Sequence, residues 1–223
     1  DRKKSSSNTL SAYKRDLDCY FEYLRFSGLD YSCVSQEHIL SFKQYLVDSG
    51  KSVATVSRCM SSLRSFYKYL VSESLCDVNP TSKVKNDKAE KKFFEILTES
   101  EVDSLLAVPD SDSYKGKRDK AMLELLYATG IRVTELVSLD VEDINLDIGY
   151  IICRRQTKER IIPIYPRAAS ALKEYINTER NFMLDETSKA LFVNVNGTRL
   201  TRQGFWKIIK QYQKSAKITT EIT

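Results

Sequence analysis

The stretch YATGIRVTELVSLDVED, residues 127–143, decides how the sequence is interpreted. An apolar helical run before it stops at Gly130, a residue suited to the left-handed turn that ends a helix. Arg132 follows between two apolar residues, and a second apolar helix starts at once, with Glu135 on the same face as Arg132. A guanidinium at such a corner suits the binding of a phosphate through two parallel hydrogen bonds. The alternative is a helix-capping arginine that pairs with Glu135 for packing.

Length and composition indicate a globular protein. The 223 residues are enough for one large domain or two small ones, and 42% are hydrophobic and 29% charged. No apolar run approaches the roughly 20 residues that span a bilayer, and the N-terminus lacks the apolar core of a signal peptide. We therefore expect a cytoplasmic protein without a membrane partner.

The chain lacks the motifs of several common chemistries. Its five cysteines are scattered without CxxC spacing, which favours free thiols in a reducing compartment. A single histidine, His38, excludes His-rich metal sites and a Ser-His-Asp triad, and no Gly-rich phosphate loop is present. We expect neither a metal nor a small-molecule cofactor. The net charge of +5 is too small to identify a nucleic-acid partner, so the arrangement of charges must decide.

The first 80 residues have the pattern of a helical domain. Apolar residues recur at three- and four-residue steps over about 10–24, 36–48 and 52–71, and a short further helix is expected near 72–77. Residues 81–95 are polar and lysine-rich, which is typical of a linker. A second domain over 96–223 then opens with a capping box between Thr98 and Glu101.

The second domain mixes helices with a few strands. Helices are expected at about 99–107, 116–129, 167–182 and 201–215. Two β-rich runs, 150–153 and 161–165, predict a hairpin whose tip, 154–160, is basic, and a further strand is expected at 191–195. The fold class is therefore mainly α with a small antiparallel sheet.

Two helical segments free of acidic residues predict contacts with a duplex. No Asp or Glu falls between Lys51 and Glu73, and small hydroxyl residues there let a helix approach phosphates and base edges. Residues 199–217 carry six Lys or Arg and no acid on a helix whose other face is apolar. The alternative is two solvated surfaces. The predicted DNA contacts are Lys43, Lys51, Thr55, Arg58, Ser61, Arg64, Lys68, Arg199, Thr201, Arg202, Gln203, Lys207 and Lys210.

These features together resemble the tyrosine recombinases of the phage integrase superfamily, and within it the XerC/XerD-type enzymes. The N-terminal unit is similar to the family's core-binding domain, and the rest to its α+β catalytic domain. The matching segments are TVSRCMSSLRSFYKYL (55–70), ATGIRVTEL (128–136), LDVEDI (139–144), KERIIPI (158–164) and LTRQGFW (200–206).

The resemblance implies an enzyme that cuts and rejoins double-stranded DNA through a 3′-phosphotyrosine link, and that self-associates into a tetramer on DNA. Arg132 takes the position that stabilises the phosphate oxygens, and Glu135 the family's acidic position. The family's hairpin lysine protonates the leaving 5′-oxygen. Counted back from Pro163 its position holds Arg155, whereas Lys158 lies three residues later, so both are candidates.

The family continues with a His-x-x-Arg box and the nucleophilic tyrosine, which are absent from this sequence. Tyr212 belongs to an apolar helical face and is expected in the core. We therefore expect a C-terminally truncated recombinase that binds DNA and lacks cleavage as it stands. The alternatives are a non-catalytic DNA-binding regulator derived from a recombinase and a helical protein-interaction module.

Overall fold

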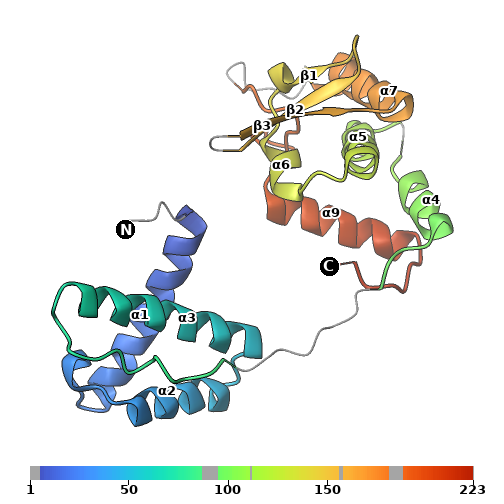
Figure 1. Cartoon of the computed structure of the whole chain (residues 1–223). Coiled ribbons are helices and arrows are strands. Elements are labelled where there is room, and N and C mark those ends of the chain that lie inside the picture. Colours follow the sequence, from blue (N-terminus) through green and yellow to red (C-terminus); the bar gives the residue numbers. More distant parts are fainter. Residues whose placement is uncertain (1–5, 87–94, 111, 156–157, 181–187, 223) are drawn as a thin grey trace. The chain divides into compact units, whose positions relative to one another are not determined.

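The computed structural model describes residues 6–86, 95–110, 112–155, 158–180 and 188–222. The chain divides into two compact units, Asp1–Phe93 and Phe94–Thr223 (Figure 1). Each unit has its own hydrophobic core. None of the described helices combines the length and the apolar character that crossing a bilayer requires.

The first unit is built from three long helices that share one aromatic core. They are α1 (Ser7–Phe26), α2 (Gln36–Asp48) and α3 (Val53–Ser72), with a short turn, η1 (Tyr31–Cys33), between the first two. A serine side chain caps the N-terminus of each long helix by accepting a backbone N–H, a role for which serine is among the preferred residues. The hydroxyls of Tyr20 and Tyr67 lie 2.6 Å apart in the core, which satisfies two polar groups that burial would otherwise leave without partners.

Two expectations for residues 72–86 need correction. The helix expected near 72–77 is absent, because α3 ends at Ser72 and Ser74 adopts a left-handed conformation with φ of 56°. The expected linker also begins later than residue 81. Thr81 and Val84 are buried against the first unit, and the backbone of this segment accepts hydrogen bonds from Lys43 and Arg64.

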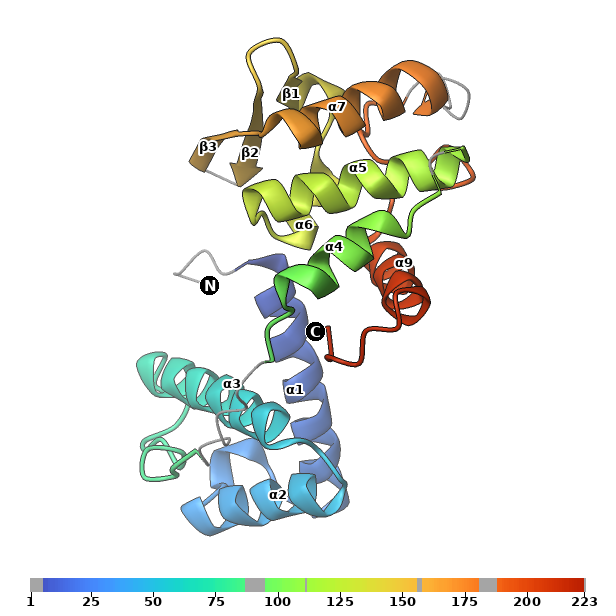
Figure 2. The same ribbon diagram turned by 90° about the vertical axis from the view of Figure 1, so that its right-hand side faces the viewer.

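The second unit packs its helices around α5. The helices are α4 (Glu99–Ala107), α5 (Tyr114–Thr129), α6 (Val133–Ser138), α7 (Pro166–Tyr175) with a π-helical continuation η3 (Ile176–Arg180), and α9 (Arg202–Ser215). Buried Met122 and Leu125 of α5 form the core with Leu136 and Leu172. In Figure 2, α5 lies between α7 on one side and α4 on the other, and α5 packs against both.

A three-stranded antiparallel sheet completes the second unit, and this confirms the predicted fold class. A 3-10 turn, η2 (Val141–Asp143), leads into β1 (Ile144–Asn145), and β2 (Tyr150–Arg155) and β3 (Lys158–Pro163) form the hairpin. The strands run further than predicted, because Arg154 and Arg160 belong to the ladder and not to the tip. The expected strand 191–195 is wrong: the described residues there form only isolated bridges.

Gly130 offers a direct test of the turn that presents Arg132. Its φ is 59°, and a Cβ added there meets nothing within 4 Å, so backbone conformation alone should set the cost of a side chain. We expect Gly130→Ala to lower the free energy of unfolding by about 1–2 kcal/mol, measured by denaturant titration. Gly130→Asn should cost clearly less, because asparagine tolerates this conformation. Equal stability of the alanine variant and the wild type would contradict this account.

Candidate phosphate-binding site and nucleic-acid interface

Arg132 lies at the corner between α5 and α6, as the sequence predicts. Gly130 ends α5 in the left-handed conformation, and Arg132 is the N-cap residue of α6. The backbone N–H of Arg132 donates to Glu135 Oε2 at 2.9 Å, and its Nη1 lies 3.6 Å from Glu135 Oε1. The Arg132 side chain remains 65% exposed. Backbone and carboxylate therefore fix the base of the side chain, while most of the guanidinium faces solvent.

The structure places Arg160 beside Arg132, although Arg160 is not among the predicted site residues. Arg160 Nη2 donates to Glu135 Oε2 at 2.7 Å, so one carboxylate contacts arginines from α6 and from β3. Glu135 is only 11% exposed, which strengthens both interactions relative to a solvated pair. Cys153 pairs with Arg160 in the sheet, and burial raises the pKa of its thiol, which keeps it neutral there. Glu135 thus ties the hairpin to the Arg132 corner.

Lys158 is placed by the hairpin on the side of Arg160. Side chains two residues apart in a strand point to the same face, so Lys158 shares the face on which Arg160 reaches Glu135. Lys158 is exposed. Arg155 is its partner in the β2–β3 register, but the side chain of Arg155 lies outside the described residues.

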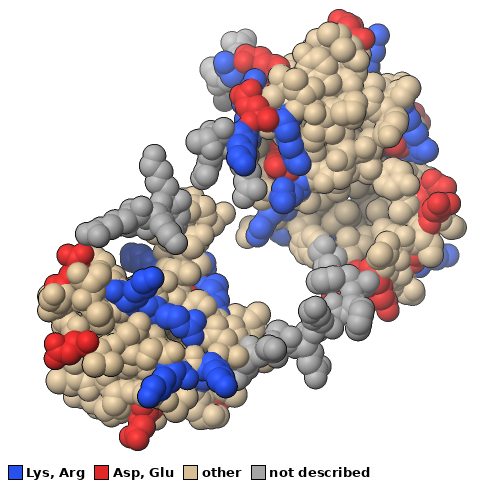
Figure 3. Space-filling view, viewed as in Figure 1, with Lys and Arg blue, Asp and Glu red and all other residues tan. Residues whose placement is uncertain are grey.

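The cations of the second unit gather around this corner. Figure 3 shows Lys and Arg side chains over the region where the hairpin, α6 and the start of α9 lie in Figure 1. Arg154 is neutralised within the unit by Asp143 and by Glu159, whose Oε1 lies 3.1 Å from Arg154 Nε.

Among the described residues, no group of three or more His, Cys, Asp or Glu side chains is arranged to hold a metal ion.

The basic helix α9 begins beside this cluster, and its residues divide by role. Thr201 is the N-cap and accepts the backbone N–H of Gly204 at 3.0 Å. Arg199 is held inside the unit: its Nη1 donates to two carbonyl oxygens at the end of α6, and it pairs with Asp140. Lys210 lies over the Trp206 ring, 4.9 Å from its centroid. The exposed predicted contacts on this helix are Arg202, Gln203 and Lys207.

The predicted contacts of the first unit also divide. Figure 3 shows a row of Lys and Arg on the face that carries α3 in Figure 1. Arg64 Nη2 donates to Val84 O at 3.0 Å, and Asn86 Nδ2 reaches Ser61 Oγ at 3.4 Å, so residues 84–86 lie along part of this face. Arg58 is tied to Asp16 of α1. Lys51 and Lys68 are exposed, Thr55 is half-buried at the start of α3, and Lys43 of α2 donates to Lys85 O.

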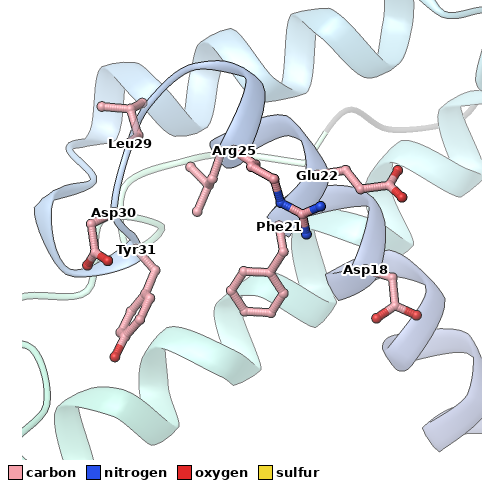
Figure 4. Close-up of a pocket in the computed structure, with 8 residues that line it drawn as sticks. Asp18, Phe21, Glu22, Arg25, Leu29, Asp30 and Tyr31 are labelled. Atoms are coloured by element: carbon pink, nitrogen blue, oxygen red, sulfur yellow. The ribbon is translucent and has the colours of Figure 1, made fainter.

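A pocket of about 800 Å³ opens at the end of α1, but its chemistry does not suit DNA. Figure 4 shows Asp18 and Glu22 on one side of it and Asp30 on the other, with the Arg25 guanidinium in the middle, above the Phe21 ring. Three carboxylates near one guanidinium repel a phosphate backbone. The surface of the first unit with the right charge for DNA is therefore the α3 face.

Tyr212 is a structural residue, as its place in the apolar pattern predicts. Its hydroxyl donates to Asp119 Oδ2 at 2.8 Å, and Arg118 binds the other oxygen of that carboxylate through Nε at 2.8 Å and Nη2 at 2.7 Å. Burial and the neighbouring Asp119 raise the pKa of Tyr212 above its ordinary value. A phenol with a raised pKa whose hydroxyl is held by a buried ion pair is poorly suited to act as a nucleophile.

Comparison with known proteins identifies the family to which both units belong. Residues 95–223 match the phage integrase family, and residues 1–74 match the phage integrase N-terminal SAM-like domain. The tyrosine recombinase XerD of Oceanobacillus iheyensis is 43% identical over 223 residues, which cover 98% of this chain and 75% of that protein.

Two solved structures show the same fold. The XerH site-specific recombinase bound to its palindromic difH substrate in a post-cleavage complex has a TM-score of 0.78 at 20% identity, with 95% of this chain and 64% of that chain covered. A lambda integrase tetramer bound to a Holliday junction has a TM-score of 0.72 at 18% identity, with 99% and 61% covered.

The chain belongs to the phage integrase family of tyrosine recombinases. Within that family it is similar to the XerD enzymes, which confirms the resemblance found in the sequence. The expected class of function, site-specific recombination, is confirmed at the level of the family, and the non-catalytic regulator is not favoured.

Proposed function

We propose that this chain binds DNA and activates the scissile phosphate in a recombination reaction that cuts and rejoins duplex DNA through a 3′-phosphotyrosyl intermediate. Residues 1–80, with residues 81–86 packed against them, act as the core-binding domain and 96–223 as the catalytic domain, in line with the family matches over 1–74 and 95–223. Arg132 binds the non-bridging oxygens of the scissile phosphate. The observation that carries this assignment is the exposed Arg132 side chain. Its backbone N–H donates to Glu135 Oε2, the oxygen that also accepts from Arg160, and its Nη1 lies 3.6 Å from Glu135 Oε1.

The chemistry of phosphoryl transfer explains why this geometry is useful. Negative charge increases on the non-bridging oxygens in the transition state, and a donor already fixed in place stabilises that charge without reorganising. Lys158 then supplies the proton to the leaving 5′-oxygen, with Arg155 as the alternative donor. Arginine suits this role less because it hardly releases its proton near neutral pH.

The partners follow from the same proposal. Duplex DNA contacts the α3 face of the first unit and the start of α9 in the second. Recombination joins two duplexes, so the protein acts as an assembly of protomers, and the lambda integrase tetramer on a Holliday junction is the supporting example. A cytoplasmic location, where bacterial DNA is available, belongs to the same proposal.

The salt dependence of duplex binding tests the DNA interface. We expect the logarithm of the association constant to fall linearly with the logarithm of salt concentration. Lys68→Ala and Lys207→Ala should each make that slope shallower by about 0.9, because each removes one phosphate contact. The matched control is Lys189→Ala, because this lysine pairs with Glu142 at 3.3 Å. The interface is misassigned if the control flattens the slope as much as the two exposed lysines do.

A further inference from the structure

A buried carboxylate connects α1 to the cationic face of α3. Asp16 of α1 is 6% exposed, and both of its oxygens lie 2.9 Å from Arg58 Nη1 on α3. Ser62, one turn further along α3, donates its hydroxyl to Asp16 Oδ2 at 2.7 Å. The same Arg58 nitrogen also donates to the carbonyl oxygen of Ala12 at 3.3 Å. Three oxygen atoms of α1, two from Asp16 and one from Ala12, therefore fix one end of the Arg58 guanidinium.

The other end of the guanidinium is available. Within the described part of the chain, every contact of the Arg58 side chain involves Nη1, so Nε and Nη2 keep their donors. The side chain is 40% exposed, and it belongs to the helix that carries no acid between Lys51 and Glu73. An arginine held by one nitrogen presents its remaining donors in a fixed direction, and it loses less rotamer entropy on binding than a free side chain.

We propose that Asp16 is a positioning residue that holds Arg58 in the orientation that binds a backbone phosphate of duplex DNA. The inference rests on the proposed DNA-binding role of the α3 face. It assigns to a buried acid on α1 a function in binding a polyanion, although the acid's own charge opposes that binding. Ser62 completes the arrangement by satisfying the carboxylate, which leaves the outward nitrogens of Arg58 for the phosphate.

The direction in which one substitution changes DNA affinity separates this positioning role from simple electrostatics. Asp16→Asn removes a negative charge, so charge alone predicts tighter binding to DNA. Positioning predicts the reverse: affinity about 10-fold weaker at 0.1 M salt, the scale of one charge-assisted hydrogen bond, and a salt slope shallower by up to about 0.9. Asp18→Asn is the matched control, because it removes the same charge from an exposed site on α1. It should leave affinity unchanged or raise it slightly.

Two further variants complete the test. Arg58→Ala should match Asp16→Asn in salt slope, and the double variant should bind no more weakly than Arg58→Ala alone. Arg58→Lys keeps the positive charge and the pair with Asp16, but it lacks the further N–H groups of the guanidinium that would bind the phosphate. It should therefore make the salt slope shallower, as alanine does. Because lysine preserves the contact between the helices, this variant remains informative if Asp16→Asn does not fold, which circular dichroism of each variant will show.

The outcomes are distinct. Asp16→Asn that folds and binds as tightly as Asp18→Asn would overturn the positioning role, as would Arg58→Lys with wild-type affinity and slope. A wild-type chain that binds no duplex in a salt-dependent manner would instead overturn the proposed function, and the inference with it. A purely structural role for Asp16 lowers the unfolding temperature but leaves the salt slope of the folded protein unchanged.

Discussion

Replacing Arg132 with alanine is expected to lower DNA strand cleavage by about 100–1,000-fold while duplex affinity changes little. The Arg132 side chain is 65% exposed at the α5–α6 corner and is one of many cations that a duplex would contact. Arg132 stabilises the negative charge that builds up on the phosphate oxygens in the transition state. Removing it should therefore lower the rate of cleavage and not the affinity for the duplex. The measurement is cleavage of a labelled duplex by an extended protein, in which this chain is followed by the C-terminal segment of a XerD relative with its tyrosine.

Two controls make the Arg132 result specific. Arg132→Lys keeps the positive charge but cannot make two parallel hydrogen bonds, and its cleavage rate should fall between those of the wild type and Arg132→Ala. Arg167→Ala removes another arginine of similar exposure, 63%, whose Nε pairs with Glu124 at 2.8 Å in a different part of the unit, and it should cleave normally. Unchanged cleavage by Arg132→Ala would falsify the role given to this residue.

Replacing Lys158 with alanine is expected to lower cleavage by about 100–10,000-fold, the usual contribution of a positioned general acid. A substrate with sulfur in place of the bridging 5′-oxygen provides the diagnostic measurement. A thiolate leaves without protonation far more readily than an alkoxide, since an ordinary thiol has a pKa near 8.5. The sulfur substrate should therefore restore most of the lost rate in Lys158→Ala, but not in Arg132→Ala.

Arg155→Ala is the companion variant, because the register places Arg155 opposite Lys158. If Lys158 is the donor, Arg155→Ala should lose less activity, and sulfur should not restore it selectively. Selective rescue of Arg155→Ala, with Lys158→Ala unaffected by sulfur, would transfer the role to Arg155. Each result therefore identifies one of the two residues.

The start of α4 was predictable from local sequence, while the ends of the hairpin strands were not. Capping is a local interaction, and the expected box between Thr98 and Glu101 is present, with both reciprocal hydrogen bonds formed. The hairpin strands carry arginines on exposed positions, which hide the alternation that marks a strand. Arg154 and Arg160 therefore looked like parts of a basic tip, although they pair with Glu159 and Cys153 in the ladder.

Basic residues were predictable as a group, but their individual partners were not. Arg58 and Arg199 belong to acid-free runs and were expected to contact DNA in the same way as their neighbours. Their acidic partners lie 42 and 59 residues away in the sequence, and only folding brings them into contact. A run of cations predicts a face, but it does not distinguish a side chain held within the unit from one directed at solvent.

The sequence by itself determined the family, through the order and spacing of its motifs. It also determined the left-handed turn at Gly130 and the place of Arg132 at the start of a helix, because these depend on contacts between residues within a few positions of one another. Tertiary structure alone decided that Arg160 shares the Glu135 carboxylate and that Asp16 holds Arg58. Those contacts join elements far apart in the chain. Their geometry is set by the packing of the core, which no local pattern of residues specifies.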